Sequence, residues 1–469
     1  MEKILRAYKK TVSIVDETAV RLYEGYVGSG IGFLLESYDK NNGRYSFFGG
    51  EPNEMITSTK DGIVIKRRNQ NTETRKGNPL TLLKEYYNQF KVSKDDGELA
   101  FTGGLVGNIG YDFIRYTEKL PDNNPDEIGI ETIQLMLVTE FIVIDHVAET
   151  LTAVVIDEDT QAGRERGTKA AGDLIIQVRE KRAPADKSFH HDGKIINKSD
   201  SLNEYSDKVD KIKNYIKEGH VFQTVLSQRW TIKTEQEGLE LYKELRELNP
   251  SPYLYYFNYQ DFEIIGSSPE MLVKQAGQKI YTCPIAGTRK RGKTPKEDEI
   301  LAAELLADEK EKAEHIMLVD LARNDMGRVS EFGTVKVTGF MEVQNYSHVM
   351  HIVSLVEGKR KDEYHPLDLA ASFLPAGTLS GAPKIRAMEI IDELEVVRRG
   401  LYGGATGYID FNGNMDFCIT IRTMIKKGHR VYLQAGAGIV ADSVPEMEYN
   451  ECCNKVMALA KTLVEEENL

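Results

Sequence analysis

Glu448, Glu451 and Lys455 form a charged group whose spacing could serve chemistry. They follow one another at intervals of three and four within residues 436–455, GAGIVADSVPEMEYNECCNK, so on a helix they would lie within about 60° of one another. One interpretation is a solvent-exposed ladder of acidic and basic side chains. The other is a carboxylate pair that holds a divalent cation, beside a turn at 436–438 where small residues let a substrate approach the backbone.

The helix that carries this group has a predicted start at residues 443–446. Ser443 and Glu446 fit a capping box, and Pro445 suits the first turn.

Glu314 is a further candidate, because it falls on the apolar face of a helix predicted over 309–325. The apolar residues within about 60° of it at 100° per residue are Met317, Leu318 and Leu321. An unpaired buried carboxylate is costly, so it should be protonated, paired or bound to a cation. Asp308 and Glu311 fit a capping box at the start of this helix, which gives Glu311 a structural explanation that Glu314 lacks.

Together these residues have the composition of a magnesium site beside a binding site for a small di-acid. Glu314, Glu448 and Glu451 offer only oxygen ligands, which suits Mg²⁺ completed by water and an anionic substrate. Arg422 and Lys455 could bind the substrate carboxylates, arginine in a bidentate manner.

Glu270 and His351 are the candidates for proton transfer. His351 shares one face of a strand predicted over 346–356 with three apolar residues, Val349, Val353 and Leu355. Taken from this strand alone, a hydrogen-bonded core histidine is the simpler explanation.

The composition excludes several classes of protein. The 469 residues include 73 acidic and 60 basic ones, a net charge of −13, and no basic block favours nucleic acid or an anionic membrane surface. The four cysteines show neither zinc spacing nor a disulfide framework, so we expect a reducing, cytoplasmic location. We expect no signal peptide and no membrane span.

Periodicity and turn residues predict the elements that must position these groups. The expected helices cover 160–181, 205–216, 239–248, 296–307 and 309–325, and a loop of small residues at 374–384 enters another helix. The expected strands cover 31–37, 44–49, 105–111, 134–145, 150–156, 221–230, 253–258, 262–266, 346–356, 405–411, 415–424 and 430–434. Residues 182–203 are the best candidate for a linker.

Four motifs in order resemble those of the chorismate-utilising enzymes. They are PIAGTRKRG at 284–292, EHIMLVDLARND at 314–325, LPAGTLSGAPK at 374–384 and the segment 436–455. Within that family the chain resembles the large subunits of anthranilate synthases, through LLES at 34–37, RYSFFG at 44–49 and NPSPYLYYF at 249–257. The resemblance extends over essentially the whole chain.

This resemblance implies an α+β fold of two antiparallel β-sheets packed orthogonally, with helices outside and the two halves of the chain intertwined. It also implies an N-terminal subdomain at 1–181 that carries part of a tryptophan regulatory site. The catalytic subdomain would be 204–469.

Two positions distinguish subgroups of the family. Ala286 stands where aminodeoxychorismate synthases that form a covalent intermediate typically carry lysine. Gln223 stands where the members that add water carry a basic lysine, and an amide cannot activate water as a base. Both residues point to amination without covalent catalysis.

The resemblance assigns roles to residues of this chain. The metal ligands would be Glu314 and Glu451, supported by Glu311 and Glu448, and Mg²⁺ would anchor and polarise the ring carboxylate of chorismate. The groups that bind the substrate carboxylates would be Thr378, Tyr402, Arg422, Gly436, Gly438 and Lys455. Ammonia would add at C2 while Glu270 protonates the leaving C4 hydroxyl. His351 would then manage the C2 proton as pyruvate leaves.

The same resemblance implies an inhibitor and a partner. L-tryptophan would contact Glu36, Ser37, Pro252, Tyr253, Leu254 and Cys418. Ammonia would come from a glutamine amidotransferase subunit in a hetero-oligomer, since the chain shows no cysteine nucleophile motif of that kind. Three alternatives stay open, namely an aminodeoxychorismate synthase without the lysine, an enzyme that stops at the amino intermediate, and a non-catalytic tryptophan-binding regulator.

Overall fold

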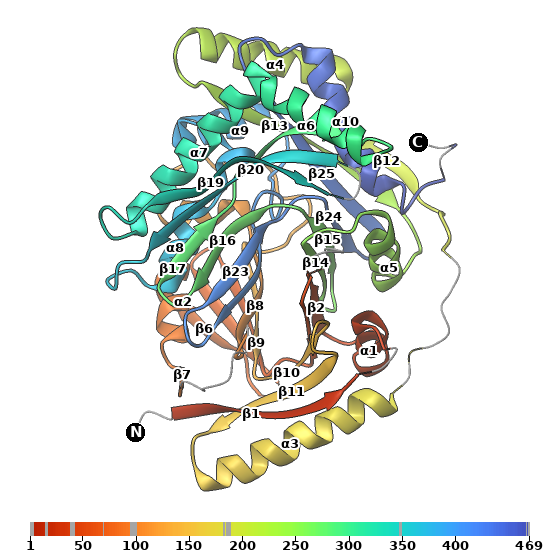
Figure 1. Cartoon of the computed structure of the whole chain (residues 1–469), viewed down its shortest axis with the longest axis vertical. Coiled ribbons are helices and arrows are strands. Elements are labelled where there is room, and N and C mark those ends of the chain that lie inside the picture. The colour runs from red at the N-terminus through yellow and green to blue at the C-terminus, as the bar shows by residue number, and fades with distance from the viewer. Residues whose placement is uncertain are drawn as a thin grey trace.

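Two large β-sheets form the frame of the molecule, with helices around them (Figure 1). The structure is a computed structural model that describes residues 4–14, 17–37, 43–68, 70–93, 101–181, 183, 189–346, 349–465 and 467. Within this part of the chain, no helix is both long enough and apolar enough to cross a membrane.

Among the described residues, the first sheet has 13 strands. In spatial order they are β12 (Lys194–Lys198), β13 (Gln223–Lys233), β25 (Arg430–Ile439), β24 (Thr423–Lys427), β15 (Glu263–Ser268), β14 (Tyr253–Asn258), β2 (Gly32–Glu36), β3 (Tyr45–Gly50), β10 (Glu140–Asp145), β11 (Thr150–Glu158), β1 (Ile4–Ser13) and β7 (Lys91–Val92), with β21 (Gly381–Ala382) paired to β13.

The part of the chain that the structure describes contributes 12 strands to the second sheet. Their order is β18 (Ile285–Lys290), β20 (Val349–Lys359), β17 (Lys279–Thr282), β16 (Met271–Ala276), β23 (Met415–Ile419), β22 (Ala405–Asp410), β8 (Gly104–Ile109), β9 (Ile133–Val138), β4 (Glu54–Thr59), β5 (Gly62–Arg67) and β6 (Glu73–Lys76), with β19 (Lys336–Asn345) paired to β20.

The helices include all five whose bounds the sequence predicts, here α3 to α7. The α-helices are α1 (Ala19–Tyr26), α2 (Pro79–Tyr87), α3 (Gln161–Glu180), α4 (Leu202–Lys217), α5 (Gly238–Leu248), α6 (Pro295–Ala307), α7 (Glu309–Val329), α8 (Pro366–Phe373), α9 (Lys384–Leu394) and α10 (Pro445–Ala460); the 3₁₀ turns are η1 (Tyr111–Tyr116) and η2 (Gly377–Leu379).

Both halves of the chain contribute strands to both sheets. β14 pairs with β2 in the first sheet, and β22 pairs with β8 in the second. Every ladder between the described strands is antiparallel except the short pair β1–β7. The predicted α+β fold with two antiparallel sheets and intertwined halves is therefore confirmed. The predicted linker includes strand β12, so its second half belongs to the first sheet; the subdomain division stays a prediction.

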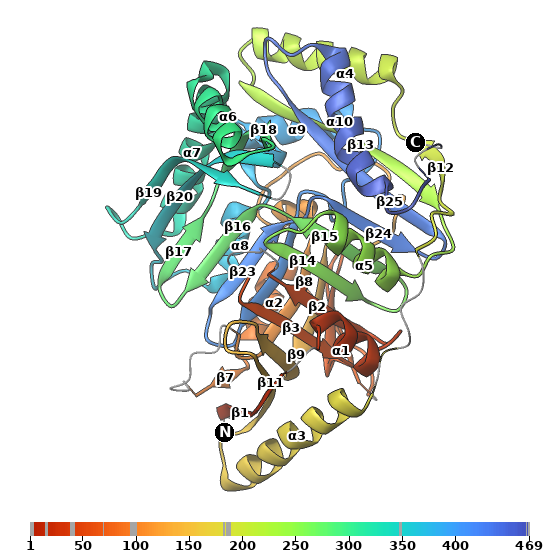
Figure 2. The same ribbon diagram turned by 45° about the vertical axis from the view of Figure 1, so that its right-hand side comes forward.

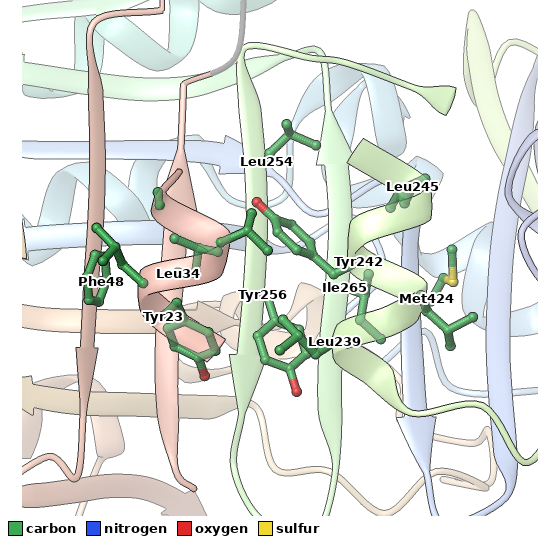
Figure 3. Close-up of a cluster of buried hydrophobic side chains, with 14 of the residues drawn as sticks. Tyr23, Leu34, Phe48, Leu239, Tyr242, Leu245, Leu254, Tyr256, Ile265 and Met424 are labelled. Atoms are coloured by element: carbon green, nitrogen blue, oxygen red, sulfur yellow. The ribbon is translucent and has the colours of Figure 1, made fainter. Parts of the chain in front are cut away.

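A shared hydrophobic core joins the two halves on one face of the first sheet. Figure 3 shows α1 and α5 placing aromatic and aliphatic side chains over neighbouring strands from both halves. The ring of Tyr256 on β14 lies 5.7 Å from that of Tyr23 on α1 and 5.9 Å from that of Tyr242 on α5. The Tyr23–Tyr256 contact is edge-on and the Tyr242–Tyr256 contact is tilted. Aromatic contacts of this kind add to the burial of apolar area, so the halves stabilise each other.

Two stretches predicted as single strands instead cross between the sheets. Residues 415–424 divide into β23 in the second sheet and β24 in the first, and residues 134–145 divide into β9 and β10 in the same way. The predominantly apolar sequence continues through each crossing because the strands on either side of it are mostly buried. The first crossing places Arg422 between the sheets with φ of +49°.

Candidate active site

The segments that resemble a chorismate site converge between β20, α7, α10 and the ends of several strands of the first sheet. Figure 2 shows α10 lying over β13 and β25, and α7 beside β18 and β20. A small cavity of about 40 Å³ opens beside Glu270 and Thr378, and the apolar face of α7 lines its other side with Leu318 and Leu321.

Glu270 follows the last residues of β15 and is only 8% exposed. Burial raises its pKa to about 8, although the hydrogen bond from Thr378 and the charges of Arg422 and Lys455 lower it. The hydroxyl of Thr378 donates to Oε1 of Glu270 over 3.1 Å. The carboxyl group is therefore mostly protonated at neutral pH, as a general acid must be.

His351 lies on β20 opposite Thr288 and is 7% exposed. Its Nδ1 lies 2.8 Å from the carbonyl oxygen of Gly287, so we assign the proton to Nδ1 and the free lone pair to Nε2. Burial lowers the pKa of this imidazole. His351 is thus a neutral ring whose orientation is fixed by a backbone carbonyl, which suits a proton acceptor.

Arg422 presents an accessible guanidinium at the crossing between the two sheets. Its side chain makes no hydrogen bond or ion pair with any residue that the structure describes, although the charge of Glu270 acts on it. An unpaired guanidinium beside a carboxylic acid is a ready binding group for a substrate carboxylate.

The small residues at 436–438 lie inside strand β25, so the predicted turn is wrong. Gly436 and Gly438 stand opposite Ser227 and Val225 of β13 in a regular ladder. The two glycines alternate with the apolar residues Ala437 and Ile439. Both faces of β25 are buried, so this run of small and apolar residues continues the strand instead of ending it in a turn.

At both positions the absence of a side chain leaves room for the side chains that cross the strand. A Cβ atom at Gly438 would lie 2.4 Å from Nε2 of Gln223, and one at Gly436 would lie 3.0 Å from the hydroxyl of Tyr402. Gln223 is itself buried, and its Oε1 accepts no hydrogen bond within the described residues. The two glycines therefore let Gln223 and Tyr402 lie against the backbone beside the site.

Lys455 links helix α10 to this strand. Its ammonium group donates to the carbonyl oxygen of Gly436 over 2.9 Å and to Oε1 of Glu451 over 2.7 Å. Both members of the ion pair are about half exposed, so the pair alone contributes little stability. The contact with Gly436 nevertheless fixes the charge of Lys455 beside the strand.

The predicted capping box at the start of α10 is wrong. Val444 is the N-cap residue, and the hydroxyl of Ser443 accepts a hydrogen bond from the amide of Val440 instead. Pro445 is the first helical residue, as expected. Asp308 does cap α7 through the amides of Lys310 and Glu311.

Glu314 is half-buried and makes no hydrogen bond or ion pair with any described residue. Burial raises its pKa, and the negative charges of Glu311 and Glu451 raise it further. Burial and the charge of Glu451 also raise the pKa of Glu448, so Glu451 acts on both Glu314 and Glu448. The side chain of Glu311 accepts a hydrogen bond from Arg289 over 3.3 Å rather than closing a capping box.

The donor set fits a magnesium ion held by few protein ligands. The described residues include no group of three or more metal-ligating side chains (histidine, cysteine, aspartate or glutamate) close enough together to hold a metal ion on their own. Mg²⁺ commonly binds through one or two carboxylates and completes its shell with water and an anionic substrate. An unpartnered, half-buried Glu314 near Glu451 suits that arrangement.

The residues expected to bind tryptophan lie where β2 and β14 pair and face β23. Glu36 stands opposite Leu254 in the β2–β14 ladder, Ser37 follows Glu36, and Pro252 directly precedes β14. The hydroxyl of Tyr253 donates to Asp416 over 3.0 Å, and Cys418 lies two residues further along β23. Their role in ligand binding stays a prediction.

Glu36 has partners that the sequence reasoning missed. Its Oε2 accepts hydrogen bonds from the hydroxyl of Tyr242 over 2.6 Å and from Nε of Arg246 over 3.0 Å. Both partners lie on α5, four residues apart and hence on one helical face. The spacing of Tyr242 and Arg246 was the sequence signal that could have identified them as a pair. The carbonyl group that orients His351 belongs to the backbone of Gly287, so no side chain in the sequence indicates it.

A model of the chorismate binding enzyme family matches residues 35–461 of this chain. The chain belongs to this family. It is 46% identical over 461 residues to anthranilate synthase component 1 of Acetivibrio thermocellus, covering 96% of this chain and 93% of that relative. It is 44% identical to the protein of the same name in Aquifex aeolicus, covering 92% of this chain and 88% of that relative.

Solved structures of this family share the fold. Anthranilate synthase component I from Streptococcus pneumoniae superposes with a TM-score of 0.77 at 38% identity, covering 89% of this chain and 92% of that one. The menaquinone-specific isochorismate synthase MenF of Escherichia coli gives a TM-score of 0.74 at 18% identity, which bears on the fold alone.

Proposed function

We propose that the chain converts chorismate and ammonia to anthranilate and pyruvate, the reaction of an anthranilate synthase large subunit and a lyase reaction. The observation that carries the proposal is Glu270, a buried acid with a pKa of about 8 beside the guanidinium of Arg422, which is unpaired among the described residues. A proton donor next to a carboxylate-binding cation suits the loss of a hydroxyl group from a di-acid. The near-full-length relatives carry this activity in their names.

Substrate binding falls to the cations and to β25. Arg422 and Lys455 neutralise the two carboxylates of chorismate, while Thr378, Tyr402 and the backbone at Gly436 and Gly438 orient them. Glu314 and Glu451, with Glu311 and Glu448 nearby, would hold Mg²⁺, which when bound neutralises and polarises the ring carboxylate.

In the first step ammonia adds to C2, the ring double bonds shift, and the C4 hydroxyl leaves as water. Glu270 delivers the proton to that oxygen and becomes a carboxylate, while the added nitrogen keeps its three hydrogens as an ammonium group. The hydrogen bond from Thr378 and the charges of Arg422 and Lys455 favour this ionised form. Gln223 supports amination because a buried amide cannot deprotonate a competing water molecule. The product is 2-amino-2-deoxyisochorismate.

In the second step the enolpyruvyl group leaves from C3 as pyruvate while C2 loses its proton. His351 takes that proton on Nε2, because Nδ1–H is committed to the carbonyl of Gly287. The resulting imidazolium can return a proton to the leaving group. The ring becomes aromatic, which drives the elimination.

We also place an inhibitory tryptophan at Glu36, Ser37, Pro252, Tyr253, Leu254 and Cys418. The ligand's ammonium group would compete with Arg246 for the carboxylate of Glu36. A glutamine amidotransferase subunit would supply ammonia as the partner of this chain.

A single assay tests the activity. The purified chain is mixed with chorismate, Mg²⁺ and an ammonium salt, and anthranilate fluorescence and pyruvate release are followed together. We expect both products in equal amounts, and glutamine should replace ammonium only when the amidotransferase subunit is added. Absence of anthranilate with ammonium would refute the proposal. A para-substituted product, with the amino group at C4, would instead favour an aminodeoxychorismate synthase.

A further inference from the structure

Arg399 and Glu395 form a buried ion pair behind the proposed active site. Only 3% of Arg399 and 5% of Glu395 are exposed. Nε of Arg399 donates to Oε2 of Glu395 over 2.9 Å, and Nη2 donates to Oε1 over 2.6 Å. A buried ion pair is tolerated only when its remaining donors are also satisfied, so the other contacts of this guanidinium indicate what the pair holds in place.

The other hydrogen bonds of Arg399 go to backbone carbonyls of two elements of the site. Nη1 donates to the carbonyl oxygen of Leu379 over 2.5 Å, and Nη2 donates to that of Val225 over 2.9 Å. Leu379 directly follows Thr378, and Val225 stands opposite Gly438 in the β13–β25 ladder. One guanidinium therefore connects the loop that carries Thr378 to strands β13 and β25, which line the proposed substrate site.

Two aromatic rings flank the same guanidinium. Its central carbon lies 4.7 Å from the ring centroid of Tyr111 and 5.6 Å from that of Tyr402. Tyr111 belongs to η1 in the N-terminal half of the chain, whereas Tyr402 is one of the predicted substrate-binding residues. Cation–π attraction favours this arrangement, so Arg399 also determines where the ring of Tyr402 lies.

Glu395 extends the contact to β25. Its Oε1 accepts hydrogen bonds from the amide and the hydroxyl of Ser227 over 2.8 and 2.7 Å. Ser227 stands opposite Gly436, and its hydroxyl also accepts a hydrogen bond from Nε2 of Gln434 over 2.8 Å. The pair thus holds both strands at the glycine positions.

We propose that Arg399 is a positioning residue for chorismate. It fixes Thr378, Tyr402 and the part of strand β25 at Gly436 and Gly438, and it does not touch the substrate itself. The inference rests on the proposed chorismate site. A lysine cannot replace it, because a single ammonium group lacks the planar fork that reaches a carboxylate and two carbonyls at once.

The test is Arg399→Lys, which keeps the charge and removes the fork. The KM for chorismate should rise at least about tenfold, as expected when binding groups are displaced by a fraction of an ångström. The KM for ammonium should stay within about twofold, since the altered contacts lie on the carboxylate-binding groups. Independently of turnover, the rise in thermal midpoint that chorismate gives without ammonium should be lost.

Arg67→Lys is the matched control. Its guanidinium pairs with Glu54 over 3.1 Å and with Glu73 over 2.6 Å, on strands at the edge of the second sheet opposite β18. This variant should keep the chorismate KM and the thermal shift. An equal rise in KM in Arg67→Lys would overturn the proposal, because the effect would then be a general loss of stability.

Two milder variants decide the matter if Arg399→Lys fails to fold. Glu395→Gln weakens the ion pair, and Tyr111→Leu removes one of the two rings that flank the guanidinium. Each variant should raise the KM for chorismate, as Arg399→Lys does. An unchanged KM and thermal shift in a folded Arg399→Lys, or in both milder variants, overturns the role. A parent chain that binds chorismate and forms no anthranilate refutes the proposed function, while loss of its thermal shift in Arg399→Lys still supports the positioning role.

Discussion

The hydroxyl of Thr378 donates a hydrogen bond of 3.1 Å to Oε1 of Glu270, which joins the loop of small residues to the acid that follows β15. Burial pushes the pKa of Glu270 up to about 8, and this hydrogen bond opposes the shift by favouring the ionised form. The proton donor and the residue that stabilises its conjugate base therefore come from segments more than a hundred residues apart.

Thr378→Val should raise the pKa of Glu270 further, because it removes the donor and keeps the volume. A hydrogen bond to an ionised group is worth roughly 1.5 kcal/mol, so we expect a shift of about one pH unit. A general acid loses activity as pH rises through its pKa, so the basic limb of kcat/KM should move upward. The measurement is a pH–rate profile at a constant concentration of un-ionised ammonia. An unmoved or lowered limb contradicts the assignment of Glu270.

Glu270→Gln should abolish turnover and change how stability depends on pH. The folded-state pKa of about 8 lies above the ordinary value of 4.5. The stability that the protonated acid contributes is therefore complete below the unfolded pKa and is lost as pH rises through 8. Glutamine mimics the protonated form, so the variant should gain thermal midpoint relative to the parent as pH rises from about 5 to about 9. Glu140→Gln, at an exposed position on β10, is the control and should show no such trend.

Glu314→Gln should weaken the use of Mg²⁺. It replaces the half-buried carboxylate that has no partner among the described residues. We expect the Mg²⁺ concentration for half-maximal activity to rise by about tenfold or more, as removing one charged ligand of a two-carboxylate site implies. Glu309→Gln on the same helix is the control, since that side chain is 86% exposed. Equal Mg²⁺ dependence in the two variants would remove Glu314 from the metal site.

Much of this site could be predicted from the sequence because helix periodicity and capping residues, which are local patterns, identify its residues. The apolar face of α7 isolated Glu314, and the cap by Asp308 marked the start of that helix. Arg422 was identified as a cation but not as a residue at a crossing, because the predominantly apolar sequence continues from β23 into β24. The error at 436–438 has a similar cause, since glycine signals both a turn and a strand that other side chains cross closely.

Contacts between distant segments were beyond prediction from periodicity. Glu36 meets Tyr242 and Arg246 across about two hundred residues, and His351 meets a backbone carbonyl that any residue type could supply. Such pairings depend on strand order in sheets that mix both halves of the chain. Neither hydrophobic period nor capping residues encode that order.

His351→Met should slow the elimination of pyruvate more than the amination. The Nε2 lone pair that would take the C2 proton is lost, while Glu270 and Arg422 stay in place. The amino intermediate should accumulate and be detectable by chromatography of quenched reactions. Ser354→Ala, also on β20, is a control for damage to the strand. Equal loss of both steps in His351→Met would count against the proposed role.

Ser37→Phe should relieve inhibition by tryptophan while uninhibited turnover stays near that of the parent. Ser37 is half-buried at the end of β2, and its amide donates to the carbonyl of Tyr45, so the backbone is held and the side chain is free to change. A phenylalanine there would occupy space that we assign to the ligand beside Glu36. The concentration of tryptophan for half-inhibition should rise by about tenfold or more, equivalent to roughly 1.4 kcal/mol of lost affinity. The measurement is anthranilate formation across a tryptophan titration.

Arg246→Lys tests whether Arg246 competes with tryptophan for Glu36 or instead supports the bound tryptophan. The guanidinium of Arg246 donates to the carboxylate of Glu36, and a lysine there keeps the charge with a weaker, single contact. If the ligand's ammonium group must displace this cation, Arg246→Lys should be inhibited at lower tryptophan concentrations, in the opposite direction to Ser37→Phe. Inhibition that weakens in both variants would mean that Arg246 supports the bound ligand. Inhibition that changes in neither would place the regulatory site elsewhere in the chain.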